Sequence, residues 1–162
     1  MISNSGQYNL LVRGGGEYHF NHTTIANFWN SGTRQTPSVY LQNYYADINN
    51  ALQIRDIDSA NFYNCIIDGN VDVEFDYDVQ APGSVNFKFN YGILKTTNST
   101  AGAQYNNLIV NPSTSTFVDV VNHDYHLATG SAAINAGFLS GVTLDKDGVA
   151  RSNPPDLGAY EN

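Results

Sequence analysis

Three arginines recur at a fixed interval in the first third of the chain. The same interval separates Arg13 from Arg34 and Arg34 from Arg55. A guanidinium group binds a carboxylate or a sulfate through two parallel hydrogen bonds. If these positions are equivalent in successive strands, the side chains stand about 5 Å apart. The spacing predicts a basic stripe that binds an anionic ligand. The structural alternative is a row of arginine stems balanced by nearby carboxylates.

A run of alternating acids follows the last of these arginines. Residues 71–79 alternate apolar and acidic side chains, which predicts a strand with its acids on the outer face. Adjacent acids on that face lie roughly 7 Å apart, so two of them with a carbonyl and water are the most that could hold one Ca²⁺ ion. A solvated acidic surface and an Arg55–Asp76 pair are the alternatives. The candidate ligands are Asp72, Glu74, Asp76 and Asp78.

One histidine shares the same periodicity. His22, Asn43 and Asn64 follow one another at the interval that separates the arginines. Aligned amides in neighbouring strands can form a ladder of hydrogen bonds at the strand spacing of about 4.8 Å. We therefore interpret His22 as the end of such a ladder, with a catalytic base as the alternative.

These residues belong to a repeat that predicts how they are positioned. The segment Leu10–Arg13 aligns with Leu52–Arg55 and Val73–Asp76, and Glu17–His22 aligns with Ser38–Asn43 and Ser59–Asn64. Apolar and polar residues alternate within each copy, as in half-buried strands. A fourth copy, Ser84–Phe89, arrives late because of the extra loop residues 80–83. The side chains predicted to stack inside are Phe20, Leu41, Phe62 and Phe87.

Short strands at an interval of roughly 20 residues, without a helical period, indicate a parallel β-solenoid. We expect an all-β fold and a single domain over residues 1–162, with coils of about 21–25 residues over about 7–97. Residues 98–162 are expected to form a last coil and a C-terminal cap. The open first coil is expected to allow self-association, because an uncovered strand edge can pair with another chain.

The tail carries a resemblance to a known group. The relevant segments are Asn122–Leu127, Gly130–Gly137, Leu144–Arg151 and Pro155–Glu161. In order and spacing they are similar to the C-terminal end of bacterial right-handed parallel β-helix proteins of the pectate-lyase-like superfamily. The resemblance implies a right-handed single-stranded parallel β-helix in a secreted or surface-exposed protein that acts on or adheres to polysaccharide. It transfers no catalytic residue. It also implies that this chain is either the C-terminal piece of a longer one or an unusually short member of the group.

Composition excludes several other classes. Seven basic and fifteen acidic residues give a net charge of −8, which argues against nucleic acid, because binding to phosphates depends on Lys and Arg. No apolar run reaches the length of a membrane span, and one cysteine cannot form an internal disulfide. The many asparagines and the 14 glycines predict many turns.

Together with the repeat, the resemblance implies an extracellular module that binds carbohydrate or mediates adhesion. We favour a role without catalysis, because no acid–base pair with suitable spacing is visible. The alternative is a polysaccharide lyase or hydrolase that acts on an acidic glycan, with Ca²⁺ as a candidate cofactor. The resemblance implies that an arginine or a lysine would then act as the base or neutralise a uronate carboxylate. The sequence leaves the glycan and the oligomeric state open.

Overall fold

The computed structural model describes all 162 residues, which form strands, turns and loops but no helix. The chain accordingly has no helix long and apolar enough to cross a membrane. The prediction of an all-β fold is confirmed. The strands are β1 Ile2–Ser3, β2 Leu10–Arg13, β3 Gly16–Asn21, β4 Thr24–Asn27, β5 Val39–Gln42, β6 Tyr44–Ala46, β7 Leu52–Ile54, β8 Ile57–Gly69, β9 Phe75–Asp78, β10 Val85–Leu94, β11 Tyr105–Val110, β12 Phe117–Asp119 and β13 Asp124–Leu127.

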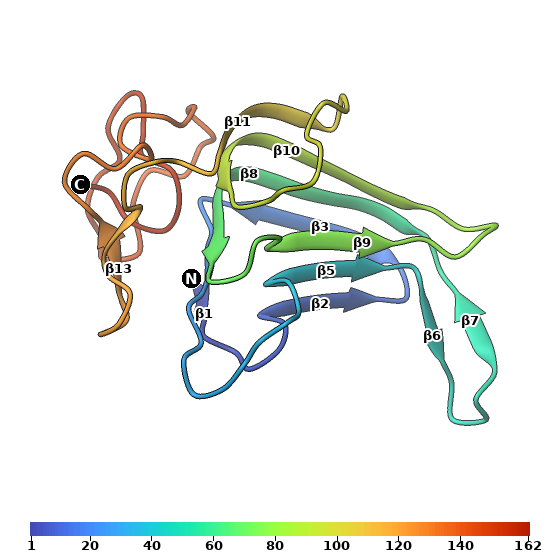
Figure 1. The fold of residues 1–162 in the computed structure, drawn as a ribbon. Coiled ribbons are helices and arrows are strands. Elements are labelled where there is room, and N and C mark those ends of the chain that lie inside the picture. Colours follow the sequence, from blue (N-terminus) through green and yellow to red (C-terminus); the bar gives the residue numbers. More distant parts are fainter.

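Two parallel sheets make up the body of the molecule (Figure 1). The larger sheet has the order β1-β4-β8-β10-β11, and β3 also pairs with β8. The smaller sheet has the order β2-β5-β9. The short hairpin of β6 and β7 is antiparallel and projects away from both sheets (Figure 1). Apart from β10 and β11, strands that neighbour one another in the two parallel sheets are not consecutive in sequence.

The core lies between the two sheets. Each strand of the smaller sheet sends alternate side chains inward, as shown by Val39 and Leu41 of β5, which are fully buried. These side chains pack in one cluster with Phe62 and Ile67 of β8. Removing each such side chain from water contributes about 1.5–3 kcal/mol, so this shared core holds the sheets together.

The larger sheet bends at one shared position. His22, Asn64, Tyr91 and Asn107 follow paired residues of neighbouring strands and all have positive φ, between 46° and 56°. Such a left-handed conformation reverses the direction of the side chains locally and turns the strand. The sheet therefore has a continuous corner along its whole height.

The predicted repeat is wrong in its register. Phe20 pairs with Phe62, and Phe62 with Phe89, so the two intervals differ from each other and both exceed the predicted one. In the smaller sheet, Leu10 pairs with Val39, and Val39 with Phe75. Segments between equivalent strands differ in length, and one of them includes the β6–β7 hairpin. Segments that we aligned as copies belong to different sheets, because Glu17–His22 and Ser59–Asn64 contribute to the larger sheet and Ser38–Asn43 contributes to the smaller one.

An aromatic stack runs through the core of the larger sheet. Ring centroids are 4.9 Å apart for Phe20 and Phe62, 4.8 Å for Phe62 and Phe89, and 5.7 Å for Phe89 and Tyr105. The prediction was correct for Phe20 and Phe62. Leu41 lies in the smaller sheet. A register shift at the start of β10 puts Phe89, rather than Phe87, in the stack.

The tail packs against the side of the larger sheet. Ala26, Ile66 and Ile93 lie on three neighbouring strands, and their buried side chains contact Tyr125 and Leu157 of the tail. Figure 1 shows the tail beside β8 and β10. We expected the C-terminal segment to cover the last coil. The structure instead shows that it covers a lateral face.

Candidate functional site

The three predicted arginines do not form a stripe. Arg13 is exposed at the end of β2, Arg55 is exposed after β7, and Arg34 is buried in the segment between β4 and β5. In register with Arg13 are Gln42 of β5 and Asp78 of β9. The stripe depended on the predicted register, so the structure separates these residues.

Arg34 forms a buried ion pair that the sequence analysis missed. Its two terminal nitrogens donate to the Glu74 carboxylate at 2.6 and 2.8 Å, and both side chains are fully buried. Arg34 also donates to the carbonyl of Asn27 at 2.7 Å. Glu74 accepts from the backbone of Ser38 and Val71. The pair joins the segments that lead into β5 and β9, which is a structural role.

The four predicted acidic ligands are also separated. Glu74 is buried with Arg34, Asp72 is exposed before β9, and only Asp76 and Asp78 lie on the outer side of that strand. No group of three or more His, Cys, Asp or Glu side chains is arranged to hold a metal ion. The structure thus does not gather the carboxylates predicted to ligate Ca²⁺.

The predicted residues Arg13, Asp76 and Asp78 do meet on one surface, the outer side of the smaller sheet. Alternation along β2, β5 and β9 leaves two rows across the strands, because Val12, Leu41 and Phe75 face the core. We call this surface the outer tyrosine face. Its rows consist of Leu11, Tyr40 and Asp76, and of Arg13, Gln42 and Asp78.

Additional tyrosines extend this face. The rings of Tyr8 and Tyr40 lie 5.5 Å apart between centroids, tilted by 31°. Tyr44 follows β5 and donates its hydroxyl to the Asp78 carboxylate at 2.6 Å. Gln42 fixes this segment by donating to the carbonyl of Tyr44 at 2.8 Å. Half-buried aromatic rings, carboxylates, an amide and a guanidinium therefore share one exposed surface.

The pKa values of two tyrosines on this face are raised above the ordinary value. Burial raises the pKa of Tyr40 to about 12, and the negative charge of Asp78 adds to this effect. The hydrogen bond to Asp78 raises the pKa of Tyr44 above its ordinary value. Both hydroxyls are consequently protonated at neutral pH, and Tyr44 already donates its proton to Asp78.

A second candidate site is a cleft of about 500 Å³ between the larger sheet and the tail. Asp68 and Lys95, near the ends of β8 and β10, form one wall, and Thr116 and Phe117 form the other. Burial raises the pKa of Asp68, although its carboxylate accepts hydrogen bonds from its neighbour's backbone and from the Thr116 hydroxyl. Of the predicted residues only Asp72 lines the cleft, because its walls come from distant segments.

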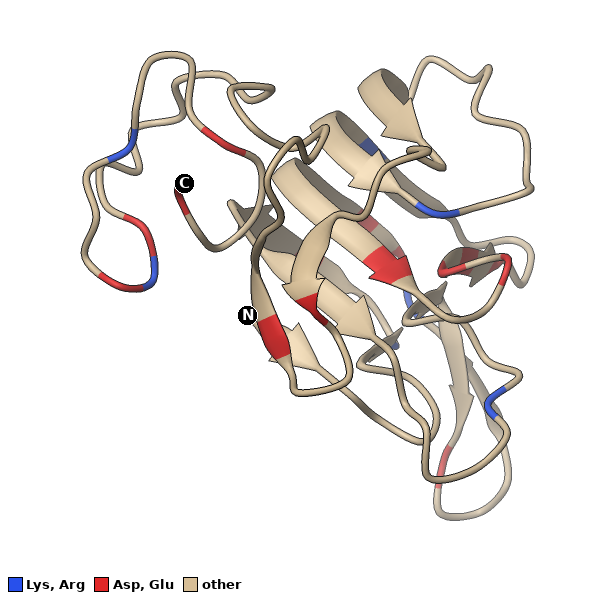
Figure 2. Ribbon diagram, turned by 60° about the vertical axis from the view of Figure 1, so that its left-hand side comes forward, with Lys and Arg blue, Asp and Glu red and all other residues tan.

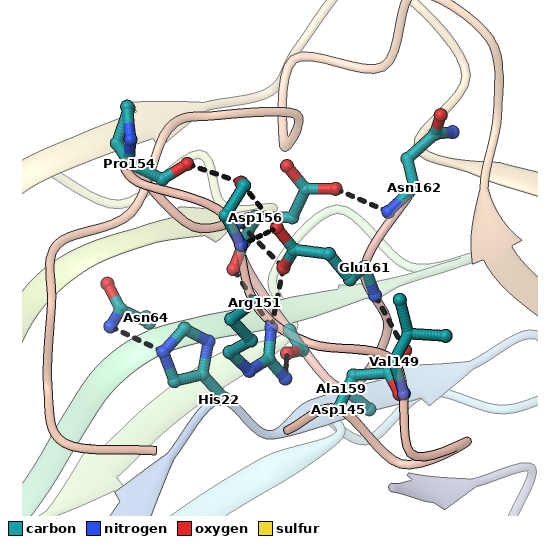
Figure 3. A network of polar contacts seen from close by, with 12 residues as sticks. His22, Asn64, Asp145, Val149, Arg151, Pro154, Asp156, Ala159, Glu161 and Asn162 are labelled. Atoms are coloured by element: carbon teal, nitrogen blue, oxygen red, sulfur yellow. Dashed lines mark hydrogen bonds and ion pairs between the residues drawn. The ribbon is translucent and has the colours of Figure 1, made fainter. Parts of the chain in front are cut away.

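The structure keeps one contact of the predicted ladder, between His22 and Asn64, and separates Asn43 from both. The Asn64 side-chain nitrogen lies 3.0 Å from His22 Nε2 (Figure 3). Asn64 also exchanges hydrogen bonds with the backbone of Phe138. Burial and the charge of Arg151 lower the pKa of His22 to about 4. Its ring is therefore uncharged at neutral pH. Asn43 lies elsewhere, paired with Gln80.

Arg151 organises the end of the tail (Figure 3). It forms an ion pair with Glu161 at 3.2 Å and donates to the carbonyl of Gly158 at 2.9 Å. The Asp156 carboxylate accepts hydrogen bonds from the backbone N–H groups of Asn135 and Asn162. The charged groups of this network all have partners within the protein, which indicates that it serves stability.

The comparisons with known proteins add no identity to this geometry. No family model, no curated protein and no solved structure matches the chain. The functional argument therefore depends on the two surfaces described above. The outer tyrosine face is the one that gathers three tyrosine rings beside carboxylate, amide and guanidinium groups.

Proposed function

We propose that the parallel sheets form a short right-handed parallel β-helix in the C-terminal part of an extracellular protein. The order of the strands supports this architecture. The chain passes from β2 to β3 and β4, then from β5 to β8, then from β9 to β10, and each strand pairs in parallel with its counterpart. Connections between parallel strands of one sheet are right-handed in about 98% of cases. The resemblance of the tail supports an extracellular location.

The function that we propose for this module is binding of a polysaccharide on the outer tyrosine face. The carrying observation is that Tyr8, Tyr40 and Tyr44 share this exposed surface with hydrogen-bonding side chains. Aromatic rings pack against the apolar C–H faces of sugars. Carboxylate, amide and guanidinium groups match the hydroxyl groups around each sugar ring. The three strands together span about 10 Å, which is enough for more than one sugar ring.

The charge of this face favours a neutral glycan. Arg13 is its only cation, and it stands in one row with Asp78, while Asp76 adds a second negative charge. Figure 2 shows how few blue segments there are in the molecule beside the red ones. An acidic glycan, which the predicted arginine stripe favoured, would meet net repulsion here.

Substitution of Tyr40 tests this proposal. Tyr40→Ala removes a stacking ring that contributes about 1–1.5 kcal/mol, so affinity for a neutral polysaccharide should fall roughly tenfold. Tyr40→Phe keeps the ring and should bind nearly as well as the parent. The measurement is affinity electrophoresis through gels that contain β-glucan, xylan or pectate. Unchanged retardation of Tyr40→Ala, or binding to pectate alone, would refute the proposal.

The cleft supports a second candidate function, cleavage of a glycan. The raised pKa of Asp68 is suited to a general acid, and Lys95 lies in the same cleft. Incubation with polysaccharides should then release reducing ends, or unsaturated products if the reaction is a lyase reaction. Asp68→Asn should abolish this release, whereas Asp58→Asn, at an exposed position, should not. Absence of products from every polysaccharide would exclude this candidate.

A further inference from the structure

A second groove lies beyond the edge of the smaller sheet. It has a volume of about 470 Å³ and is located between β9 and the segment that leads into β11. We call it the aromatic groove. Its walls consist of Phe75, Asp76, Tyr77, Asn98, Ser99, Gln104 and Tyr105.

The aromatic rings of the groove belong to a larger cluster. Tyr105 lies on β11, the last strand of its sheet, and stacks on Phe89 at 5.7 Å with an angle of 12° between the rings. Phe87 lies between Tyr77 and Tyr105, with centroid distances of 4.9 and 5.6 Å. No strand continues the sheet beyond β11, so no further ring covers Tyr105 from that side. The cluster presents ring surface to the groove.

The charge of the groove is negative. Asp76 is its only charged residue, and no Lys, Arg or His side chain lines it. One Asp76 oxygen accepts the backbone N–H of Tyr77 at 2.9 Å, which leaves the other oxygen without a protein partner. Burial and the nearby Tyr77 and Asp76 raise the pKa of Tyr105 to about 12, so its ring stays neutral.

We propose that the aromatic groove binds a trimethylammonium group, such as that of choline. A quaternary ammonium ion is weakly hydrated and is attracted to the faces of aromatic rings. Asp76 supplies the compensating charge without a requirement for a hydrogen-bond donor on the ligand. The volume exceeds that of the cation, so the group that carries it contacts Asn98, Ser99 and Gln104. This site is separate from the sugar-binding surface, although Asp76 borders both.

Charge, rather than shape, distinguishes this ligand from a sugar or an apolar molecule. A neutral molecule of the same shape, 3,3-dimethylbutan-1-ol, replaces the quaternary nitrogen of choline with carbon. It would fill the same volume but gain nothing from Asp76 or from the ring quadrupoles. Comparison of the two compounds therefore isolates the interaction that we propose.

The test is an NMR titration of the full chain with choline chloride and, separately, with the neutral alcohol. We expect saturable shifts of the amides of Tyr77 and Tyr105 with choline, and affinity at least roughly tenfold weaker for the alcohol. Equal affinity for both compounds, or no saturable shift with choline, overturns the proposal. Sodium chloride at matched concentration controls for ionic strength.

Three variants separate this site from the outer tyrosine face. Asp76→Asn and Tyr105→Leu should each weaken choline binding by several-fold, and Tyr40→Ala should leave it unchanged. If Tyr105→Leu loses the dispersed amide spectrum of a folded chain, Asp76→Asn decides, because its side chain is outside the core. Unchanged choline affinity in Asp76→Asn, or equal losses in Tyr40→Ala, would overturn the assignment.

Discussion

Replacement of Glu74 by glutamine should destabilise the protein severely. The Glu74 carboxylate accepts two hydrogen bonds from Arg34, two from Ser38 and one from the backbone of Val71, at distances of 2.6–3.0 Å. Glutamine has nearly the same shape but removes the negative charge. Its amide nitrogen must also face donors, whichever way the group is oriented. The Arg34 guanidinium then remains buried without a counterion.

The expected cost follows from this geometry. Breaking a buried ion pair by removing one partner costs about 3–5 kcal/mol, because an uncompensated charge stays in the interior. Domains of this kind have total stabilities of about 5–15 kcal/mol, so the loss is a large fraction of the whole. Asp58→Asn, at an exposed position on β8, should cost less than about 0.5 kcal/mol and serves as the control.

Urea denaturation followed by tryptophan fluorescence and circular dichroism measures this change. The midpoint of Glu74→Gln should shift to lower urea without a change of slope. The double variant Arg34→Met/Glu74→Leu should be more stable than Glu74→Gln, since it buries no unpaired charge. A loss below about 1 kcal/mol in Glu74→Gln would refute the reasoning, because it would mean that the pair is solvated.

Three further predictions concern the core and the pH dependence. Phe62→Ala, which removes the middle of the aromatic stack, should cost about 3–5 kcal/mol in urea denaturation, and a cost near 1 kcal/mol would contradict the packing. Gly69→Ala should lower the thermal midpoint, because an added Cβ would meet Glu74 Oε1 and the carbonyl of Asn27; an unchanged midpoint would show that this contact relaxes freely. Burial lowers the pKa of His22 from 6.5 to about 4, so the unfolded chain takes up a proton on this ring before the folded chain does. The stability that the uncharged ring contributes is therefore complete above pH 6.5 and is lost as the pH falls toward 4. His22→Gln should show a weaker fall of the thermal midpoint over that range, and identical pH profiles would contradict the assignment.

Local alternation in the sequence was sufficient to predict the class of the fold and part of its core. Strand-like alternation correctly placed Phe20 and Phe62 inside, because a strand has the same period in any register. The register between strands was not predictable in this way. The register depends on loop lengths. The β6–β7 hairpin lies between β3 and β8, and the interval from Phe20 to Phe62 is twice the repeat that we assumed.

The same limit explains the arginines. Arg34 is buried because Glu74, 40 residues away, comes to face it when the segments before β5 and β9 align. No local sequence pattern predicts that Arg34 and Glu74 form an ion pair. Arg13 and Asp78, predicted for different roles, meet in one row for the same reason. Pairing across a parallel sheet therefore decides which candidate residues can act together.

Mapping of a neutral oligosaccharide on the protein by NMR tests the central claim most directly. The account predicts that titration with a β-glucan or xylan oligosaccharide shifts the amides of Leu11, Tyr40 and Asp76 and the side-chain amide of Gln42. These shifts should persist at high salt, because the ligand carries no charge. Shifts confined to the cleft around Asp68 and Thr116, or none with any neutral oligosaccharide, would contradict it.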